Sequence, residues 1–381
     1  MIKRKNILLV IAYTVVLDVL LAYAADSYLP FWRETYPTND HRLRSETHHH
    51  DIAPMREIVE AWGPVRYNYA TNALGFKDAA PRAVDLNRQK GRWLLLGDSF
   101  TEGIGFDFPT SMAGQIARQV ACQGIEVLNA GVGGYAPSVY WRKARHLIET
   151  VGLKPERVIV FIDISDIRDE IDLYPEDADG NLIVPDPEPP STMERFGHFL
   201  RDHSLSARLF TLIRDRLAYV RKDLKRRYQT AKAFEKSFWQ VETADMMEFA
   251  TVPHKASRWT YDDKAWAEYG EKGRAKATAN MDRLSDLLKR HGIALTVAVY
   301  PWPDQIFKDP LAVRHQVYWQ EWANKHDAQF VSLFPAFTEG APRETLARYF
   351  IPGDFHWNAE GHRLAAKAFL AGFDPKTPLC E

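Results

Sequence analysis

The feature that most constrains the fold is a regular alternation of short apolar runs with helical patterns from residue 91 onward. The apolar runs have the length and composition of buried strands. They cover residues 92–96, 125–131, 157–165, 293–301 and 329–334. Helical patterns cover residues 109–122, 137–151, 276–291, 311–326 and 359–372. Strands joined through helices pair in parallel by right-handed crossovers, so the sequence predicts an α/β fold: a three-layer α/β/α sheet of about five parallel strands.

The N-terminus carries an apolar segment preceded by basic residues. Lys3, Arg4 and Lys5 come before a mostly apolar stretch at 6–25, which is long enough to cross a bilayer as a helix. Asp18 interrupts this stretch, and Ala22-Tyr23-Ala24 is similar to a signal-peptidase site. A signal anchor over 1–25 and a cleaved signal peptide are both open, and we favour the anchor. Both place the remaining chain in the periplasm or another extracytoplasmic space, with the anchor in the inner membrane.

The rest of the chain divides by composition. Residues 26–90 are rich in Pro, Asn, Thr and His and predict an irregular N-terminal extension. Residues 91–375 form the predicted main domain, interrupted by a helical insertion at 171–275. Within this insertion, 206–234 has a strongly basic helical pattern. This pattern indicates either a solvated helix face or a surface for anionic lipid or an acidic polysaccharide.

Charge, cysteines and histidines argue against several function classes. The formal net charge is −1, so no global field indicates a nucleic acid partner. Cys122 and Cys380 lie far apart without CxxC spacing, so we expect neither a disulfide nor a zinc site. The motif HHHD at 48–51 offers metal-ligand types, but successive residues point in different directions. We expect no metal and no other cofactor.

Side chains that could take part in catalysis lie in four stretches, at the ends of predicted strands or in the loop before the last helix. They are Ser99 in Gly-Asp-Ser, the glycine-rich stretch 129–135, the acidic stretch 163–166 and the stretch 353–362 before the last helix. In parallel sheets, ligands gather at the carboxyl ends of the strands. We therefore expect these four stretches to meet at one edge.

A nucleophilic serine needs a neighbouring base and a group that orients that base. His356 can be the base and Asp354 can hold its imidazole, because residues at i and i+2 of an extended segment lie on the same side. The sequence thus predicts a chain of Ser99, His356 and Asp354.

The order of these motifs resembles the SGNH/GDSL hydrolase superfamily, over residues 91–170 and 276–372. The resemblance implies a flavodoxin-like sheet in which Ser99 is the nucleophile and its own N–H is an oxyanion donor. It also implies a second donor at Gly134, with the neighbouring Gly133 left open. Asp354 and His356 match the last motif of this family.

Two departures qualify this resemblance. The family's third motif supplies an asparagine where this chain has Ser165, so either the shorter hydroxyl or another group completes the oxyanion hole, or hydrolysis is slow. The D-x-H spacing of Asp354 and His356 resembles a periplasmic branch that handles acyl groups on polysaccharides, including alginate O-acetylation proteins.

The resemblance implies a serine hydrolase that forms an acyl-serine and deacylates a carbohydrate or related small ester. Two alternatives stay open. One is a membrane-tethered O-acyltransferase that works with polysaccharide-assembly proteins. The other is a non-catalytic glycan-binding domain.

Overall fold

The computed structural model describes residues 4–28, 41–63, 65–178, 180–184, 191–373 and 380. The chain divides into two compact units. One comprises Met1–Thr38 and Pro185–Gln240, and the other comprises Asn39–Val184 and Val241–Glu381.

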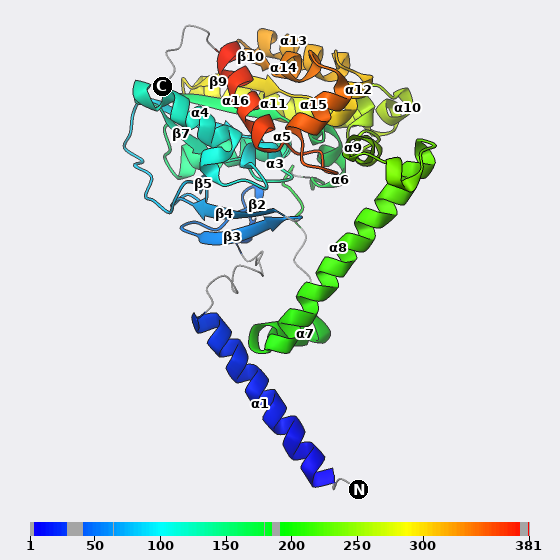
Figure 1. The fold of residues 1–381 in the computed structure, drawn as a ribbon. Coiled ribbons are helices and arrows are strands. Elements are labelled where there is room, and N and C mark those ends of the chain that lie inside the picture. Colours follow the sequence, from blue (N-terminus) through cyan, green and yellow to red (C-terminus); the bar gives the residue numbers. More distant parts are fainter. Residues whose placement is uncertain are drawn as a thin grey trace. The chain divides into compact units, whose positions relative to one another are not determined.

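The larger unit is built on an eight-stranded sheet with the order β10-β9-β8-β6-β7-β5-β4-β3 (Figure 1). Its parallel strands are β6 Arg92–Leu96, β7 Glu126–Asn129, β8 Arg157–Ile162, β9 Ala294–Val299 and β10 Gln329–Ser332. These five strands correspond to the predicted apolar runs, and they confirm the predicted α/β fold. Leu94, Leu95 and Leu96 are all fully buried, because β6 lies at the centre of the sheet and is covered on both faces.

Three antiparallel strands from the N-terminal extension continue this sheet. They are β3 Glu57–Trp62, β4 Val65–Thr71 and β5 Lys77–Asp78, with β5 pairing with β7. A separate hairpin consists of β1 Arg42–Ser45 and β2 His49–Ile52. The prediction of an irregular extension is wrong for these segments. Their strands are short or carry many polar residues, so no apolar run marks them in the sequence.

Helices cover the sheet, and each predicted helix of the main domain is present with shifted ends. The α-helices of this unit are α3 Ser99–Glu102, α4 Met112–Val120, α5 Pro137–Arg145, α6 Asp166–Asp172, α9 Thr243–Thr251, α10 Asp263–Ala265, α11 Glu271–Arg290, α12 Pro303–Lys308, α13 Tyr318–Lys325, α14 Phe334–Thr338, α15 Pro342–Tyr349 and α16 Ala359–Phe373. Shorter 3-10 and π-helical segments are η1 Phe108–Thr110, η2 Ala121–Gln123, η3 His146–Thr150, η5 Arg258–Thr260, η6 Trp266–Gly270 and η7 Val313–Val317. Helix α5 packs on α11, and α4 packs on α16.

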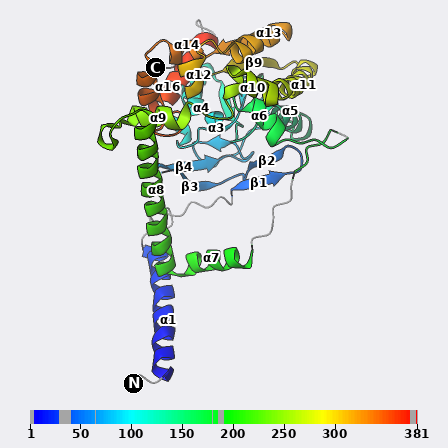
Figure 2. The same ribbon diagram turned by 90° about the vertical axis from the view of Figure 1, so that its right-hand side faces the viewer.

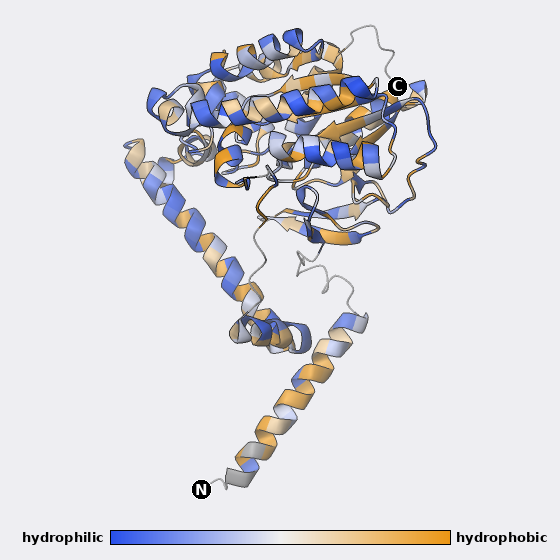
Figure 3. Cartoon of the chain, turned by 180° about the vertical axis from the view of Figure 1, so that it is seen from behind, coloured by the Kyte–Doolittle hydropathy of each residue, from blue (hydrophilic) through white to orange (hydrophobic). Residues whose placement is uncertain are grey.

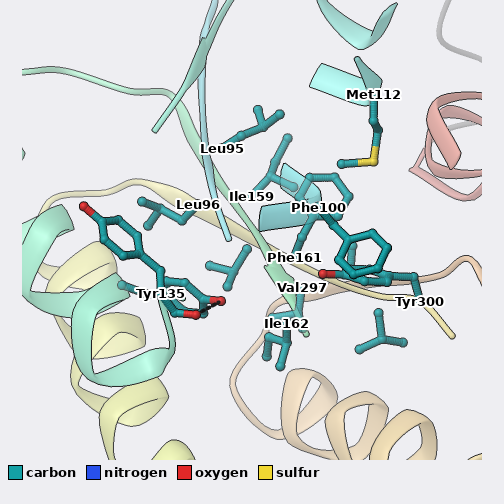
Figure 4. Packing of buried hydrophobic residues seen from close by; sticks show 14 of the residues in the cluster. Leu95, Leu96, Phe100, Met112, Tyr135, Ile159, Phe161, Ile162, Val297 and Tyr300 are labelled. Atoms are coloured by element: carbon teal, nitrogen blue, oxygen red, sulfur yellow. Dashed lines mark hydrogen bonds between the residues drawn. The ribbon is translucent and has the colours of Figure 1, made fainter. Parts of the chain in front are cut away.

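The core lies between the strands and these helices. Alternate residues of β6 point to opposite faces, so Leu95 lies on the side of Met112 and Leu96 on the side of Tyr135 (Figure 4). All four side chains are buried. The sheet is therefore a rigid base whose strand ends can hold side chains in fixed positions.

The smaller unit consists of helices. They are α1 Arg4–Tyr28, α7 Thr192–His203, α8 Leu205–Ala233 and the 3-10 turn η4 Phe238–Gln240. Within α1, residues Leu9–Tyr28 have a mean hydropathy of 1.9, and in the described part of the chain this is the one helix that could cross a membrane by length and composition. A signal sequence has the same properties. Figure 3 shows α1 as predominantly hydrophobic and α8 as predominantly hydrophilic.

The two cysteines form a disulfide, so the expectation of unpaired cysteines is wrong. Cys122 lies in η2 at the end of α4, and its Cα is 5.7 Å from that of Cys380. The N–H of Cys380 also donates to the carbonyl of Gln119. A separation of 258 residues in sequence conceals this proximity, because only the folded sheet and α16 bring the C-terminus back to α4.

Candidate active site

Ser99 follows the central strand through a turn that only glycine permits. A Cβ atom on Gly97 would lie 2.1 Å from Thr101 Oγ1 and 3.1 Å from the carbonyl oxygen of Phe161. Asp98 then caps α3, its carboxylate accepting from the N–H of Phe100 at 3.0 Å. Ser99 is therefore held at the first position of α3, at the carboxyl end of β6.

His356 and Asp354 lie in the loop between α15 and α16 and reach the same strand end. His356 Nε2 is 2.8 Å from Ser99 Oγ, and His356 Nδ1 is 2.6 Å from Asp354 Oδ1. The aspartate also accepts from the backbone N–H of His356 at 2.9 Å. Because a carboxylate only accepts, Nδ1 carries the proton and Nε2 is left to accept from the serine hydroxyl.

The N-terminal extension supplies a fourth member of this chain, which the sequence did not indicate. Trp62, at the end of β3, donates from Nε1 to Asp354 Oδ2 at 2.8 Å, and its ring stands edge-on to His356 at 5.1 Å. Burial raises the pKa of Asp354, but hydrogen bonds and the charge of His356, with a smaller contribution from Trp62, outweigh it and hold that pKa below its usual value. Asp354 therefore stays ionised at neutral pH.

The glycine-rich loop lies against Ser99 and leaves one amide free. A Cβ atom on Gly133 would lie 3.6 Å from Ser99 Cβ. The N–H of Gly133 donates to Glu102 Oε2 at 2.6 Å, so this amide is already used. Within the described part of the chain, the N–H of Gly134 has no hydrogen-bond partner. Gly134 has a φ of +83°, which favours glycine.

Two groups hold this loop through its carbonyls. His50 Nε2 lies 3.0 Å from the carbonyl oxygen of Gly133, and the Tyr174 hydroxyl donates to the carbonyl of Gly134. The Tyr135 hydroxyl donates to the carbonyl of His50 at 2.6 Å, which fixes β2 against the loop. The histidine motif thus supports the loop next to Ser99. Among the described residues, no group of three acidic, histidine or cysteine side chains is arranged to hold a metal ion.

Glu102 connects the loop to the N-terminal hairpin. Its carboxylate accepts from Arg42 Nη2 at 2.7 Å and from the Tyr69 hydroxyl at 3.0 Å, besides the N–H of Gly133. Burial raises the pKa of Glu102, but the charge of Arg42 and these hydrogen bonds lower it to about 2. The acid is therefore ionised at all ordinary pH values and holds the Gly133 amide in place.

Ser165 lies just past β8, the strand beside β6. Its N–H donates to Asp163 Oδ1 at 2.6 Å, and Trp302 Nε1 donates to the other oxygen of Asp163 at 2.7 Å. Burial raises the pKa of Asp169 to about 7, against a hydrogen bond from the Ser165 side chain. The Ser165 side chain opposes the raised pKa of Asp163 in the same way, so two carboxylates lie within reach of its hydroxyl.

A mostly parallel α/β sheet that carries a hydrogen-bonded serine, histidine and aspartate at its strand ends defines a serine-type hydrolase. The comparison with family models agrees. Residues 95–364 match the model of the GDSL-like lipase/acylhydrolase family, and the chain belongs to this family. None of the curated proteins compared with the chain matches it.

The chain is also similar to solved structures of a lipolytic protein and of esterases. One is a lipolytic protein of the G-D-S-L family from Desulfitobacterium hafniense, at 12% identity and a TM-score of 0.37, covering 73% of this chain and 97% of that one. Another is a catalytic mutant of an acetylxylan esterase from Geobacillus stearothermophilus, at 14% identity and a TM-score of 0.39, covering 74% and 94%. A third is an esterase from Pseudoalteromonas sp., at 9% identity and a TM-score of 0.39, covering 74% and 97%.

Proposed function

We propose that this protein is a serine esterase that removes acyl groups from acylated carbohydrate, held outside the cytoplasm by α1. One observation carries the proposed chemistry: Ser99 Oγ lies 2.8 Å from His356 Nε2, whose other nitrogen lies 2.6 Å from Asp354. The half-buried ring of Phe355, stacked on Trp302 at 4.2 Å, offers a flat apolar surface next to His356, which suits a sugar ring.

The location outside the cytoplasm has two supports. The basic residues before α1 favour an orientation with the N-terminus in the cytoplasm. The disulfide between Cys122 and Cys380 is typical of oxidising compartments such as the periplasm.

The reaction proceeds in two halves. Ser99 Oγ attacks the ester carbonyl carbon while its proton passes to His356 Nε2, and Asp354 stabilises the resulting imidazolium. His356 then gives this proton to the leaving alcohol oxygen as the ester bond breaks, which leaves an acyl-Ser99. Water next attacks the acyl carbon and gives its proton to His356. Breaking the acyl–oxygen bond releases the acid and returns the proton to Ser99.

The negative charge on the carbonyl oxygen is stabilised by hydrogen-bond donors next to Ser99. We assign this role to the N–H of Ser99 and the N–H of Gly134, because the neighbouring N–H of Gly133 is used by Glu102. The Ser165 hydroxyl is the third donor, in place of the family's asparagine, and turns away from Asp163 and Asp169 to do so.

Hydrolysis by the full chain tests this proposal. We expect purified enzyme to hydrolyse p-nitrophenyl acetate and to release acetate from an acetylated oligosaccharide. Ser99→Ala and His356→Ala should each lower kcat at least about 1,000-fold. Ser191→Ala and His291→Ala, which alter the same residue types and contact none of the site residues, are the matched controls and should keep full activity.

Other outcomes contradict specific parts of the proposal. Unchanged hydrolysis in both Ser99→Ala and His356→Ala would exclude the mechanism. Hydrolysis of p-nitrophenyl acetate without release from any acetylated oligosaccharide would exclude the carbohydrate substrate. Transfer of acetyl groups to an added oligosaccharide, in preference to water, would identify an O-acyltransferase instead.

A further inference from the structure

His254 presents a ring N–H close to the candidate catalytic residues, and the mechanism above does not use it. This histidine lies between α9 and η5, and its ring stands edge-on to those of Trp302 at 5.1 Å and Phe355 at 5.0 Å. Its Nδ1 accepts from the N–H of Ala256 at 3.3 Å, so a neutral imidazole carries its proton on Nε2. Among the described residues this Nε2 has no hydrogen-bond partner, and it is accessible to solvent.

The surroundings of His254 keep its imidazole neutral. Burial, followed by the charge of Arg168, lowers the pKa of His254 below its usual value. The charges of Asp354 and His356 also act on this ring, in opposite directions, because both lie nearby. At neutral pH the side chain is therefore an uncharged donor that points its N–H into the solvent beside the catalytic histidine.

Buried polar side chains of α12 hold the loop that carries His254. Helices α9 and α12 lie next to each other (Figure 2). The Asp304 carboxylate accepts from the Ser257 hydroxyl. Gln305 Nε2 donates to the carbonyl of Ser257 at 3.1 Å and to Thr260 Oγ1 at 3.0 Å. Asp304 and Gln305 are both fully buried, so the loop has a fixed position on the domain.

Trp259 joins the same loop to the end of β8. Its Nε1 donates to the carbonyl of Ile164 at 2.9 Å, and Ile164 directly precedes Ser165. The indole is fully buried. The loop is thus attached to a strand end that forms part of the candidate site, and His254 is held beside this site.

We propose that His254 and Phe355 form a subsite for the sugar that leaves as the alcohol, with His254 Nε2 donating to one of its hydroxyl oxygens. The subsite rests on the esterase activity and the carbohydrate substrate proposed above. His356 Nε2 gives its proton to the leaving alcohol oxygen, so this oxygen must come within hydrogen-bond distance of His356. The ring of Phe355 lies 4.3 Å from that of His356, and therefore beside the departing alcohol.

The two side chains suit the two kinds of surface on a sugar. The half-buried ring of Phe355, supported from behind by Trp302 at 4.2 Å, can pack against the C–H face of a pyranose. A hydroxyl at the edge of the same sugar can accept from His254. An aromatic wall with one fixed polar group is the usual composition of a specific ligand site.

Hydrolysis of two kinds of acetate ester by the full-length protein tests the subsite. The leaving group of phenyl acetate has an aromatic ring and no further hydrogen-bonding group, whereas a panel of partially O-acetylated oligosaccharides, neutral and acidic, offers hydroxyls. His254→Phe removes the N–H and keeps an aromatic ring against Trp302 and Phe355. His254→Gln keeps a donor, and His291→Ala is the control at an exposed histidine.

We expect the ratio of kcat/KM for the best oligosaccharide to kcat/KM for phenyl acetate to fall about tenfold in His254→Phe. Most of this fall should come from a higher KM for the oligosaccharide, because the hydrogen bond is present in the bound substrate as well as in the transition state. His254→Gln should recover part of the ratio, and His291→Ala should keep the wild-type ratio.

The remaining outcomes separate the subsite from the proposed function. An unchanged ratio in His254→Phe, with acetate still released from oligosaccharides, would overturn the subsite and leave the proposed function standing. Wild-type protein that hydrolyses phenyl acetate but none of the oligosaccharides would overturn the carbohydrate substrate, and the subsite with it. Wild-type protein that hydrolyses neither kind of ester would contradict the esterase itself.

Discussion

A single peptide group, between Gly133 and Gly134, is held on one side and, among the described residues, has a free N–H on the other. Its carbonyl oxygen lies 3.0 Å from His50 Nε2, and its N–H is the proposed oxyanion donor. The carbonyl and the N–H of one peptide point in opposite directions. A hydrogen bond from His50 to the carbonyl therefore fixes the direction of the N–H and polarises it. Burial lowers the pKa of His50 to about 4, so its imidazole is neutral near pH 7 and donates from Nε2.

His50→Ala should lower kcat about tenfold with little change in KM. The misdirected Gly134 N–H affects the tetrahedral intermediate, where the oxyanion forms, and not the binding of the substrate. His50→Gln, whose amide can reach the same carbonyl, should recover part of the loss. Steady-state kinetics with p-nitrophenyl acetate measures both, and His291→Ala is the control. A change in KM alone, or no rescue by glutamine, would show that His50 does not position this peptide.

Asp354→Asn should lower kcat about 100- to 10,000-fold, because asparagine neither holds the correct imidazole tautomer nor stabilises the imidazolium. The loss should be smaller than that of His356→Ala. Kinetics and circular dichroism of both variants provide the comparison. Equal losses together with an altered spectrum would assign Asp354 a structural role only.

Trp62→Phe removes the N–H that donates to Asp354 and keeps an aromatic ring. We expect a three- to tenfold lower kcat and an unchanged fold, since this donor acts through the carboxylate. Trp239→Phe, at a side chain that is 88% exposed, is the matched control. Identical kinetics in both variants would show that Trp62 only packs against the site.

At the scale of elements, the parallel strands were predictable and the antiparallel ones were not. β6 and β8 are apolar after their first residue because helices cover both faces, and this pattern is visible in the sequence. β5 has two residues, and β4 alternates polar and aromatic side chains, so neither forms an apolar run. The role of Trp62 was missed for a different reason: its partner Asp354 is 292 positions away in the sequence.

β5 contributes a buried lysine whose titration should appear in the stability of the protein. Lys77 Nζ donates to the carbonyls of Gly103 at 2.7 Å and Phe106 at 2.6 Å. Burial lowers its pKa to about 8. In the unfolded chain a lysine keeps its proton up to about pH 10.4. The unfolded chain therefore binds this proton more tightly than the folded protein does. The contribution of Lys77 to the free energy of unfolding is fully present above about pH 10.4 and is lost as the pH falls through 8.

Lys77→Met should remove this dependence. We expect the free energy of unfolding of the wild type to rise between about pH 8 and pH 10 relative to that of the variant, measured by urea denaturation. Lys154→Met, at an exposed position, should follow the wild type. Parallel curves for the wild type and Lys77→Met would contradict the lowered pKa.

For the whole molecule, the disulfide joins two segments that the sequence gives no reason to pair. Spacing motifs identify cysteines that are close along the chain, whereas Cys122 and Cys380 meet only after α4 and α16 have packed. Ser99 is also distant in sequence from His356 and Asp354. They were predictable because each follows a recognisable motif, whereas the cysteines have none.

Replacing both Cys122 and Cys380 by serine should lower the free energy of unfolding by about 2–5 kcal/mol, because the bridge restricts a long loop of the unfolded chain. The kcat should stay unchanged, since the bridge lies at the end of α4, away from Ser99. Urea denaturation of both proteins, with and without reductant, measures the effect. Equal stability of the oxidised wild type and the double variant would contradict it.

The origin of Trp62 in the first part of the chain and of Asp354 and His356 in the last has a consequence for biosynthesis. A nascent chain that ends before residue 354 contains the serine but lacks its base. Such an incomplete chain therefore cannot hydrolyse esters by this mechanism. The hydrogen-bonded chain of Ser99, His356 and Asp354 can therefore form only when synthesis has passed residue 356.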